Sequence, residues 1–230
     1  MCLTLISATP AAAAQPVPAA KASVITTWNQ IAVSTVTATG PSPTNFNYFA
    51  FVHLAMYNAV VGITGRYELY KWDAVGSKQA SPEAAAATAA HRVLKNYFPA
   101  QAATLDASLA ASLARVKNPV ARRKGVAFGV RAANRIIALR VNDGRNAAVT
   151  VPTGTTPGHW RPEPSTALFT SAWLGGVTPL AIDSAIQFAP GAPPAISTQT
   201  YLEEFNEVRD FGGQNLDTKR TAEQAQTARF

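Results

Sequence analysis

The stretch that decides the fold is TNFNYFAFVHLAMYNAVVGI, residues 44–63. Drawn as a helix, it carries apolar side chains on nearly every side. A helix that is apolar all round is buried, whereas a surface helix keeps one polar face. Gly62 and Gly65 favour a helix end at this point. The stretch therefore predicts a buried helix that ends at these glycines.

Helical patterns occur on both sides of this stretch. Residues 81–98 have a clear start, because Ser81 can cap a helix, Pro82 suits its first position and Glu83 favours its positive end. Pro99 ends that helix. The other predicted helices are 23–38 (with Trp28, Ile31 and Thr35 at helical spacing), 101–116 (with Leu105, Leu109 and Leu113), 120–143, 198–213 and one that starts at Thr221.

The predicted helix at 120–143 contains the densest basic run, ARRK at 121–124. Its apolar residues fall within a narrow arc, and the cations lie nearly opposite, which predicts a solvated basic face. The arc consists of Val126, Val130, Ala133, Ile137 and Val141, and the opposite cations are Lys124, Arg131 and Arg135.

Residues 144–197 differ from the rest, because proline and glycine are frequent and exclude long helices. A loop of this length is usually functional or wraps a neighbouring surface. No strand-like alternation of useful length and no long internal repeat is present. We therefore predict an all-α, antiparallel helical bundle with a long Pro/Gly-rich loop at about 144–197.

Composition limits the classes of partner. The chain has 230 residues, a net charge of +7 and 47% hydrophobic residues, which allows a sizeable core. The cations are mostly scattered and no aromatic-rich basic motif accompanies them, so we expect no nucleic-acid binding. No apolar stretch approaches the roughly 20 residues that a bilayer span needs, so we expect the mature chain to be soluble. The single cysteine, Cys2, leaves the remainder of the chain without a disulfide, thiolate metal site or cysteine nucleophile.

The first 22 residues resemble a secretory leader. A short apolar run, Cys2 to Ile6, precedes small residues with A-x-A matches around Ala11 to Ala14. The positive start of such a leader is missing, since the first cation is Lys21. The alternative is a disordered Ala/Pro-rich tail. We expect export, with a mature N-terminus near Gln15 and a secreted or periplasmic location.

Three histidines are the first candidates for chemistry. His53 and His91 each share a helical face with apolar residues, where a histidine is usually a hydrogen-bonded core residue rather than a catalyst or ligand. His159 lies in the Pro-rich loop beside Trp160 and Arg161. It is the most site-like of the three, although no carboxylate is placed near it by spacing.

An acidic stripe is the other candidate. Glu203, Glu207 and Asp210 share one face of the 198–213 helix, and Tyr201, Phe205 and Val208 lie on the other face. Such oxygens could hold a hard cation, but an exposed acidic face is the favoured interpretation. No zinc-protease, nucleophile-elbow, P-loop or dinucleotide motif is present. The residues alone therefore predict no catalytic, cofactor or metal site.

Several stretches, taken in order, resemble a known family. They are FNYFAFVHLAMYNAVVGI (46–63), SPEAAAATAAHRVLKNYFPAQAATLDASLAASL (81–113), GVRAANRIIALRVNDG (129–144), GHWRPEP (158–164), IQFAPGAPPAISTQTYLEEFNEV (186–208) and RTAEQAQTARF (220–230). Residues 24–230 thus resemble the N-terminal helical half of a bacterial vanadium-dependent haloperoxidase-like protein, of the type 2 phosphatidic acid phosphatase superfamily.

The resemblance implies an anion pocket that holds vanadate or a substrate phosphate. In the family this pocket uses three motifs: Lys with Arg-Pro seven residues on, Pro-Ser-Gly-His, and Ser-Arg followed by His. Here Arg161-Pro162 has Gly154 in place of the lysine, and Pro157-Gly158-His159 lacks the serine. No Ser-Arg pair occurs. No family site residue is therefore transferred to this chain, and vanadate is expected only in a full-length parent.

The chain ends with TAEQAQTARF, in which Thr221 and Gln224 have the spacing of a capping box. The family motifs follow this helix, so the resemblance implies truncation within it. We expect 1–22 to be the leader and 23–230 an N-terminal helical module. That module would be a scaffold, inactive alone, whose partner is the missing catalytic half. The alternative is a free-standing helical interaction module that docks on a separate chain or self-associates.

Overall fold

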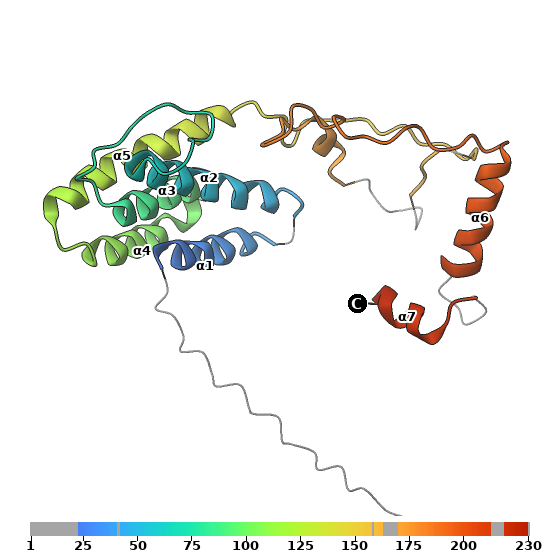
Figure 1. Cartoon of the computed structure of the whole chain (residues 1–230), viewed down its shortest axis with the longest axis horizontal. Helices are drawn as coiled ribbons and strands as arrows, with labels where there is room; N and C mark the ends of the chain where they lie inside the picture. Colours follow the sequence, from blue (N-terminus) through green and yellow to red (C-terminus); the bar gives the residue numbers. More distant parts are fainter. Residues whose placement is uncertain (1–22, 41, 158, 163–169, 213–218, 230) are drawn as a thin grey trace, which may run out of the picture. The chain divides into compact units, whose positions relative to one another are not determined.

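The computed structural model describes residues 23–40, 42–157, 159–162, 170–212 and 219–229. The predicted leader lies outside them. The described residues are helical with no strand, which confirms the all-α prediction (Figure 1). The helices are α1 (Val24–Thr37), α2 (Asn45–Thr64), α3 (Pro82–Tyr97), α4 (Ala102–Ala114), α5 (Pro119–Leu139), α6 (Gln199–Gly212) and α7 (Ala222–Arg229), with 3-10 turns η1 (Pro99–Gln101) and η2 (Ala172–Gly176).

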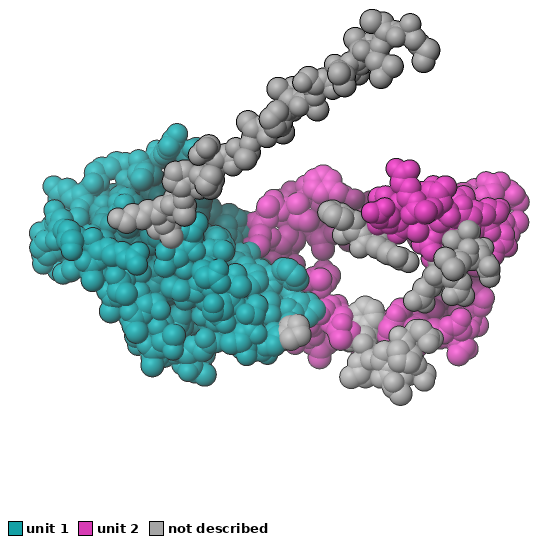
Figure 2. All heavy atoms as spheres, turned by 90° about the horizontal axis from the view of Figure 1, so that it is seen from below, with its two compact units in different colours: residues 1–141 teal, residues 142–230 magenta. Residues whose placement is uncertain are grey.

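The chain divides into two compact units, residues 1–141 and 142–230 (Figure 2). Unit 1 contains α1 to α5 and η1, and unit 2 contains η2, α6 and α7.

Helix α2 is the buried helix predicted from residues 44–63. Phe51, Val52 and Ala55 are fully buried, and the helix ends at Gly65, whose φ of 67° is left-handed and whose N–H bonds the Val61 carbonyl at 2.7 Å. Gly62 does not end the helix, contrary to the prediction. It lies within α2, and a Cβ there would come 2.5 Å from Cζ of Phe128.

Helix α2 also bears on the membrane prediction. By length and composition alone it could cross a bilayer, so an apolar stretch of spanning length does exist. Half of its most apolar part is buried inside unit 1, where α2 packs against α1, α3 and α5. It is the one such helix among the described residues, and its packing as a core helix leaves no clear membrane span there.

Helix α3 is the centre of unit 1, because it packs against α1, α2, α4 and α5 (Figure 1). Its start is as predicted: the Ser81 hydroxyl accepts from the Ala84 N–H at 3.1 Å, and Pro82 is the first helical residue. All but one of the residues from Ala84 to Ala90 are alanine, the exception being Thr88, and all are buried. Short side chains on every side allow four helices to approach this one.

The contact between α3 and α5 corrects the predicted apolar arc. The buried face of α5 consists of Gly125, Phe128, Gly129, Ala132, Ala133 and Ile136. A Cβ on Gly125 would lie 2.5 Å from the Ser81 carbonyl oxygen. Of the predicted arc only Ala133 is buried, and Val141 is 66% exposed. The face is turned by about one residue, or 100°, because close backbone approach at the two glycines outweighs the burial of valines.

Two hydrogen bonds join α1 to its neighbours, one to α4 and one to η1. The Trp28 indole N–H donates to Ser112 Oγ at 3.1 Å, and Trp28 is fully buried. The amide of Gln101 donates to the Thr35 carbonyl at 2.7 Å. Leu105 alone of the predicted leucine stripe is fully buried, whereas Leu109 and Leu113 are half-buried.

Unit 2 has little regular structure before α6. In its described part, residues 144–197 form one short 3-10 turn and otherwise irregular backbone, as the Pro/Gly-rich composition predicted. The capping box that opens α7 is confirmed: the Thr221 N–H bonds Gln224 Oε1 at 2.9 Å, and the Gln224 N–H bonds Thr221 Oγ1 at 3.2 Å.

Candidate functional site

Unit 1 has an apolar groove of about 630 Å³ beside α2. Leu54, Met56, Val60 and Val61 line it from α2. His53, Tyr57 and Thr64 of α2 also line it. The remaining walls are Ile25 of α1 and, from the segment that follows α2, Arg66 and Tyr67. A groove of this volume, mostly apolar with a few polar groups, has the character of a small-molecule site.

The chain that forms one wall is fixed to α2 by hydrogen bonds. The Tyr57 hydroxyl donates to the Glu68 carbonyl at 2.7 Å. The fully buried Asn58 amide donates to the Tyr70 carbonyl at 3.0 Å and accepts from the Tyr70 N–H at 2.8 Å. These three bonds replace the strand or helix partners that an irregular segment lacks. The wall is therefore built into the fold rather than formed on binding.

His53 lies in this groove and is exposed, which corrects its prediction as a core residue. It is hydrogen-bonded as expected, since its Nε2 lies 2.9 Å from Asn29 Oδ1 on α1. The C-terminal end of α2 is cationic. Lys78 donates to the Thr64 carbonyl at 3.0 Å, and the exposed Arg66 guanidinium lies 5.4 Å from the ring centre of Tyr67.

His91 is a buried, hydrogen-bonded histidine, as predicted. Its Nε2 lies 2.7 Å from Asp106 Oδ1, and its ring meets the edge of Trp28 at 6.3 Å between centres. Lys95 donates to both Asp106 oxygens at 2.8 Å. Hydrogen bonds from Lys95 and then from His91 lower the pKa of Asp106 below its ordinary value. The cluster joins α3 to α4.

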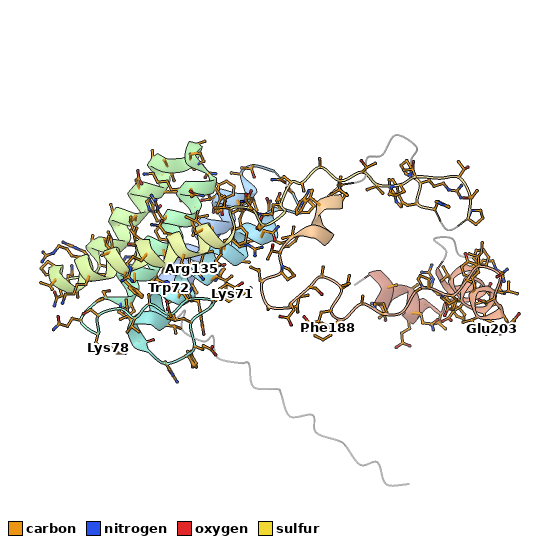
Figure 3. All side chains as sticks on the ribbon, turned by 90° about the horizontal axis from the view of Figure 1, so that it is seen from above. Lys71, Trp72, Lys78, Arg135, Phe188 and Glu203 are labelled. Carbon is orange, nitrogen blue, oxygen red and sulfur yellow. The ribbon has the colours of Figure 1, made fainter. Side chains whose placement is uncertain are left out.

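Unit 1 also has a polar hollow, which is lined by Lys71, Trp72, Asp73 and Arg135. Figure 3 labels three of these residues, Lys71, Trp72 and Arg135. Arg135 was predicted to be solvated, and it donates through Nε and Nη2 to the Lys71 carbonyl at 2.8 and 2.6 Å. Lys71 has a φ of 45°, which is uncommon for a residue with a side chain. Trp72 stacks on Phe128 at 5.3 Å. Arg135 therefore holds a strained turn against α5.

His159 lies in a small loop of unit 2 that closes through a bond from the Gly154 N–H to the Trp160 carbonyl at 3.2 Å. Its Nδ1 is 2.8 Å from Thr156 Oγ1, and Arg161 donates to the Thr155 carbonyl at 3.3 Å. Both polar side chains thus bond within their own loop.

The acidic residues of α6 do not converge on a point. Glu203 (Figure 3) and Glu207 are both exposed. Asp210 pairs with Arg209 at 3.0 Å and Lys219 at 2.6 Å. Hydrogen bonds from Lys219 and then Arg209 lower the Asp210 pKa. Among the described residues no group of three His, Cys, Asp or Glu side chains could hold a metal ion. The opposite face of α6 is also uncovered, because none of the helix is buried.

The described residues thus define an all-α helical-bundle protein with an apolar groove in unit 1. Comparisons with protein-family models, with curated proteins and with solved structures found no match to this chain. The sequence did not predict this groove, although the spacing of His53, Tyr57 and Val60 places them on one face of a helix. Its outer walls, Ile25 and Tyr67, come from other segments, so helical periodicity could not place them.

Proposed function

We propose that this chain is the helical scaffold portion of an exported, vanadium-dependent haloperoxidase-like enzyme and does not catalyse by itself. The proposal rests on the ordered sequence resemblance described above. The all-α bundle of unit 1 is compatible with it, since a scaffold needs a firm core more than a reactive pocket. The parent enzyme would oxidise halide with peroxide or hydrolyse phosphate esters, through an anion site in polypeptide outside these 230 residues.

The observation that carries this proposal is the loop containing His159 and Arg161. These two residues most resemble the anion-site motifs of the family, yet they bond to Thr156 and to the Thr155 carbonyl of their own loop. An oxyanion site needs several donors aimed at one point. One guanidinium and one imidazole that bond locally are too few for tight vanadate or phosphate binding.

The test is a binding and turnover measurement on the 230-residue chain. We expect no saturable vanadate binding by calorimetry, no vanadate-dependent bromide oxidation and no phosphatase turnover. Stoichiometric vanadate binding that His159→Ala abolishes would overturn the proposal. A chain that extends downstream and contains the three motifs provides the positive control.

A second candidate function, self-association, is favoured by the uncovered apolar side of α6. Leu202, Phe205, Val208 and Phe211 are 42–69% exposed, and the rings of Tyr201 and Phe205 stack at 6.4 Å. A second copy of α6 is a suitable occupant. In an antiparallel pair, the cation Arg209 near one end comes opposite the acidic Glu203 end of the other copy.

Sedimentation velocity over a concentration series tests this candidate. Self-association through α6 predicts a dimer that Phe205→Glu dissociates, because it places a charge in the apolar contact. The matched control, Glu207→Gln on the acidic face of α6, should leave the dimer intact. A monomer at every concentration would exclude this candidate and leave the scaffold proposal unaffected.

A further inference from the structure

We propose that the apolar groove beside α2 binds an amphipathic carboxylate, with its apolar chain along α2 and its carboxylate at Arg66. This inference is independent of the scaffold proposal, because it concerns unit 1 alone. The groove comprises the ten residues given above, and its volume of about 630 Å³ is within the range of small-molecule sites.

The floor of the groove accounts for an apolar chain. Leu54 and Val60 supply the exposed aliphatic surface of the floor, since Met56 and Val61, which also line it, are almost completely buried. The walls add solvent-accessible apolar surface, because the side chains of Ile25 and Tyr67 are 36% and 61% exposed. Exposed aliphatic and aromatic surface gathered in a concave site favours occupation by an apolar group.

The polar atoms at the edge of the groove are mostly in use. Tyr57 donates to the Glu68 carbonyl, Thr64 Oγ1 donates to the Val60 carbonyl at 3.0 Å, and His53 faces Asn29. Arg66 is different: no described carboxylate or carbonyl accepts a hydrogen bond from its guanidinium, which lies over the Tyr67 ring. It is therefore the cationic group at the groove with donors to offer a ligand.

The charge and shape of Arg66 select the head group. A guanidinium presents two parallel N–H donors that match a carboxylate. Lys78, bonded to the Thr64 carbonyl, adds a second positive charge at this end of α2, and the exposed Glu68 is the one carboxylate between residues 64 and 72. The local charge stays positive, so an anionic head is favoured over a cationic one.

The shape of the groove is set before a ligand arrives. The bonds from Tyr57 to Glu68 and between Asn58 and Tyr70 fix the chain containing Arg66 and Tyr67 against α2. A prepared wall reduces the ordering that binding requires. The groove is also open at the surface, so a chain can enter without unfolding of α1 or α2.

The experiment titrates the full 230-residue chain with octanoate and decanoate, below micelle-forming concentrations, and with neutral methyl decanoate. We expect saturable binding of decanoate, tighter than octanoate by roughly two- to fourfold per CH₂ group. Methyl decanoate should bind at least about tenfold more weakly, since the charge-assisted bond is lost. Methyl shifts in NMR spectra should locate the ligand at Ile25, Leu54 and Val60.

Two matched variants test the head-group contact. Arg66→Gln should weaken decanoate binding by about tenfold or more and leave methyl decanoate unchanged. Arg123→Gln, an exposed arginine on α5, should change neither. No saturable decanoate binding, equal binding of acid and ester, or equal binding by Arg66→Gln and the native chain would each overturn the proposal. Because Arg66 is exposed, the variant is expected to fold, and its thermal melt verifies this.

Discussion

Gly129 on α5 faces the carbonyl oxygen of Ala85 on α3 so closely that a Cβ atom at Gly129 would collide with it. The same Cβ would lie 3.0 Å from the Ala85 Cα and 3.0 Å from the Thr88 Cβ. These neighbours are backbone or branched atoms that cannot rotate away. The two helices therefore depend on glycine at this position for their separation.

Gly129→Ala should destabilise unit 1 although alanine is the better helix former. Alanine favours a helix over glycine by about 1 kcal/mol, but overpacking a close contact costs about 1–3 kcal/mol, and backbone atoms lie on the receiving side. We expect a net loss in the free energy of unfolding, measured by urea denaturation. Gly175→Ala, where nothing lies within 4 Å of the added Cβ, is the control. A gain in stability at position 129 would contradict this packing.

Asn58→Ala should cost about 1–3 kcal/mol, because the backbone N–H and the carbonyl of Tyr70 each lose a hydrogen bond to Asn58. Asn58 is fully buried and bonds the Tyr70 carbonyl and N–H at 3.0 and 2.8 Å. Hydrogen exchange should also become faster at the Tyr70 amide. Asn134→Ala, which removes an exposed amide bonded to Arg92, serves as the control, with an expected change within about 0.5 kcal/mol. Unchanged exchange at Tyr70 would contradict the proposed role of Asn58.

The carboxylate of Asp106 should make stability depend on pH. Its pKa is lowered in the folded chain, chiefly by the hydrogen bond from Lys95 and then by that from His91. The unfolded chain therefore binds the proton more tightly, so the stabilisation is present above the ordinary value of 3.8 and is lost as pH falls through the lower folded pKa.

The measurement compares the native chain with Asp106→Asn over a range of pH. The native chain should be the more stable at pH 6, and the difference should shrink below about pH 4. Lys95→Met should reduce the same difference, since it removes the larger cause of the shift. A difference that stays constant down to pH 2 would show that Asp106 acts through packing rather than charge.

Ser112→Ala should destabilise unit 1 by about 1–3 kcal/mol, because it leaves the buried indole N–H of Trp28 without its acceptor. The matched control is Ser108→Ala, a half-buried serine of the same helix whose hydroxyl donates to the Thr104 carbonyl. Unfolding followed by tryptophan fluorescence reports the change. Combining Ser112→Ala with Trp28→Phe should cost less than the sum of the single changes. Strict additivity would argue against the bond.

Much of the fold could be read from local signals. Ser81 and Pro82 predicted the start of α3, Thr221 and Gln224 that of α7, and the proline and glycine content of 144–197 its lack of long helices. Each of these signals acts between residues a few positions apart, so the sequence alone contains both partners. The apolar side chains on nearly every side of residues 44–63 predicted a core helix for the same reason.

The misplaced face of α5 and the candidate groove depended on distant partners. Hydrophobic periodicity gives Gly125 and Gly129 no weight, yet their contact with α3 orients α5. His53 was expected in a core, but it lies at the edge of a groove whose other walls include Ile25 and Tyr67, from other segments of the chain.

The sequence by itself determined that this protein is helical, where most helices begin and that α2 belongs to the core, because capping and hydrophobic periodicity are short-range. Only the tertiary structure decided which side of α5 meets α3 and that Arg66 stands at an apolar groove. Close packing and concavity arise from segments far apart in the chain, and no local pattern records them.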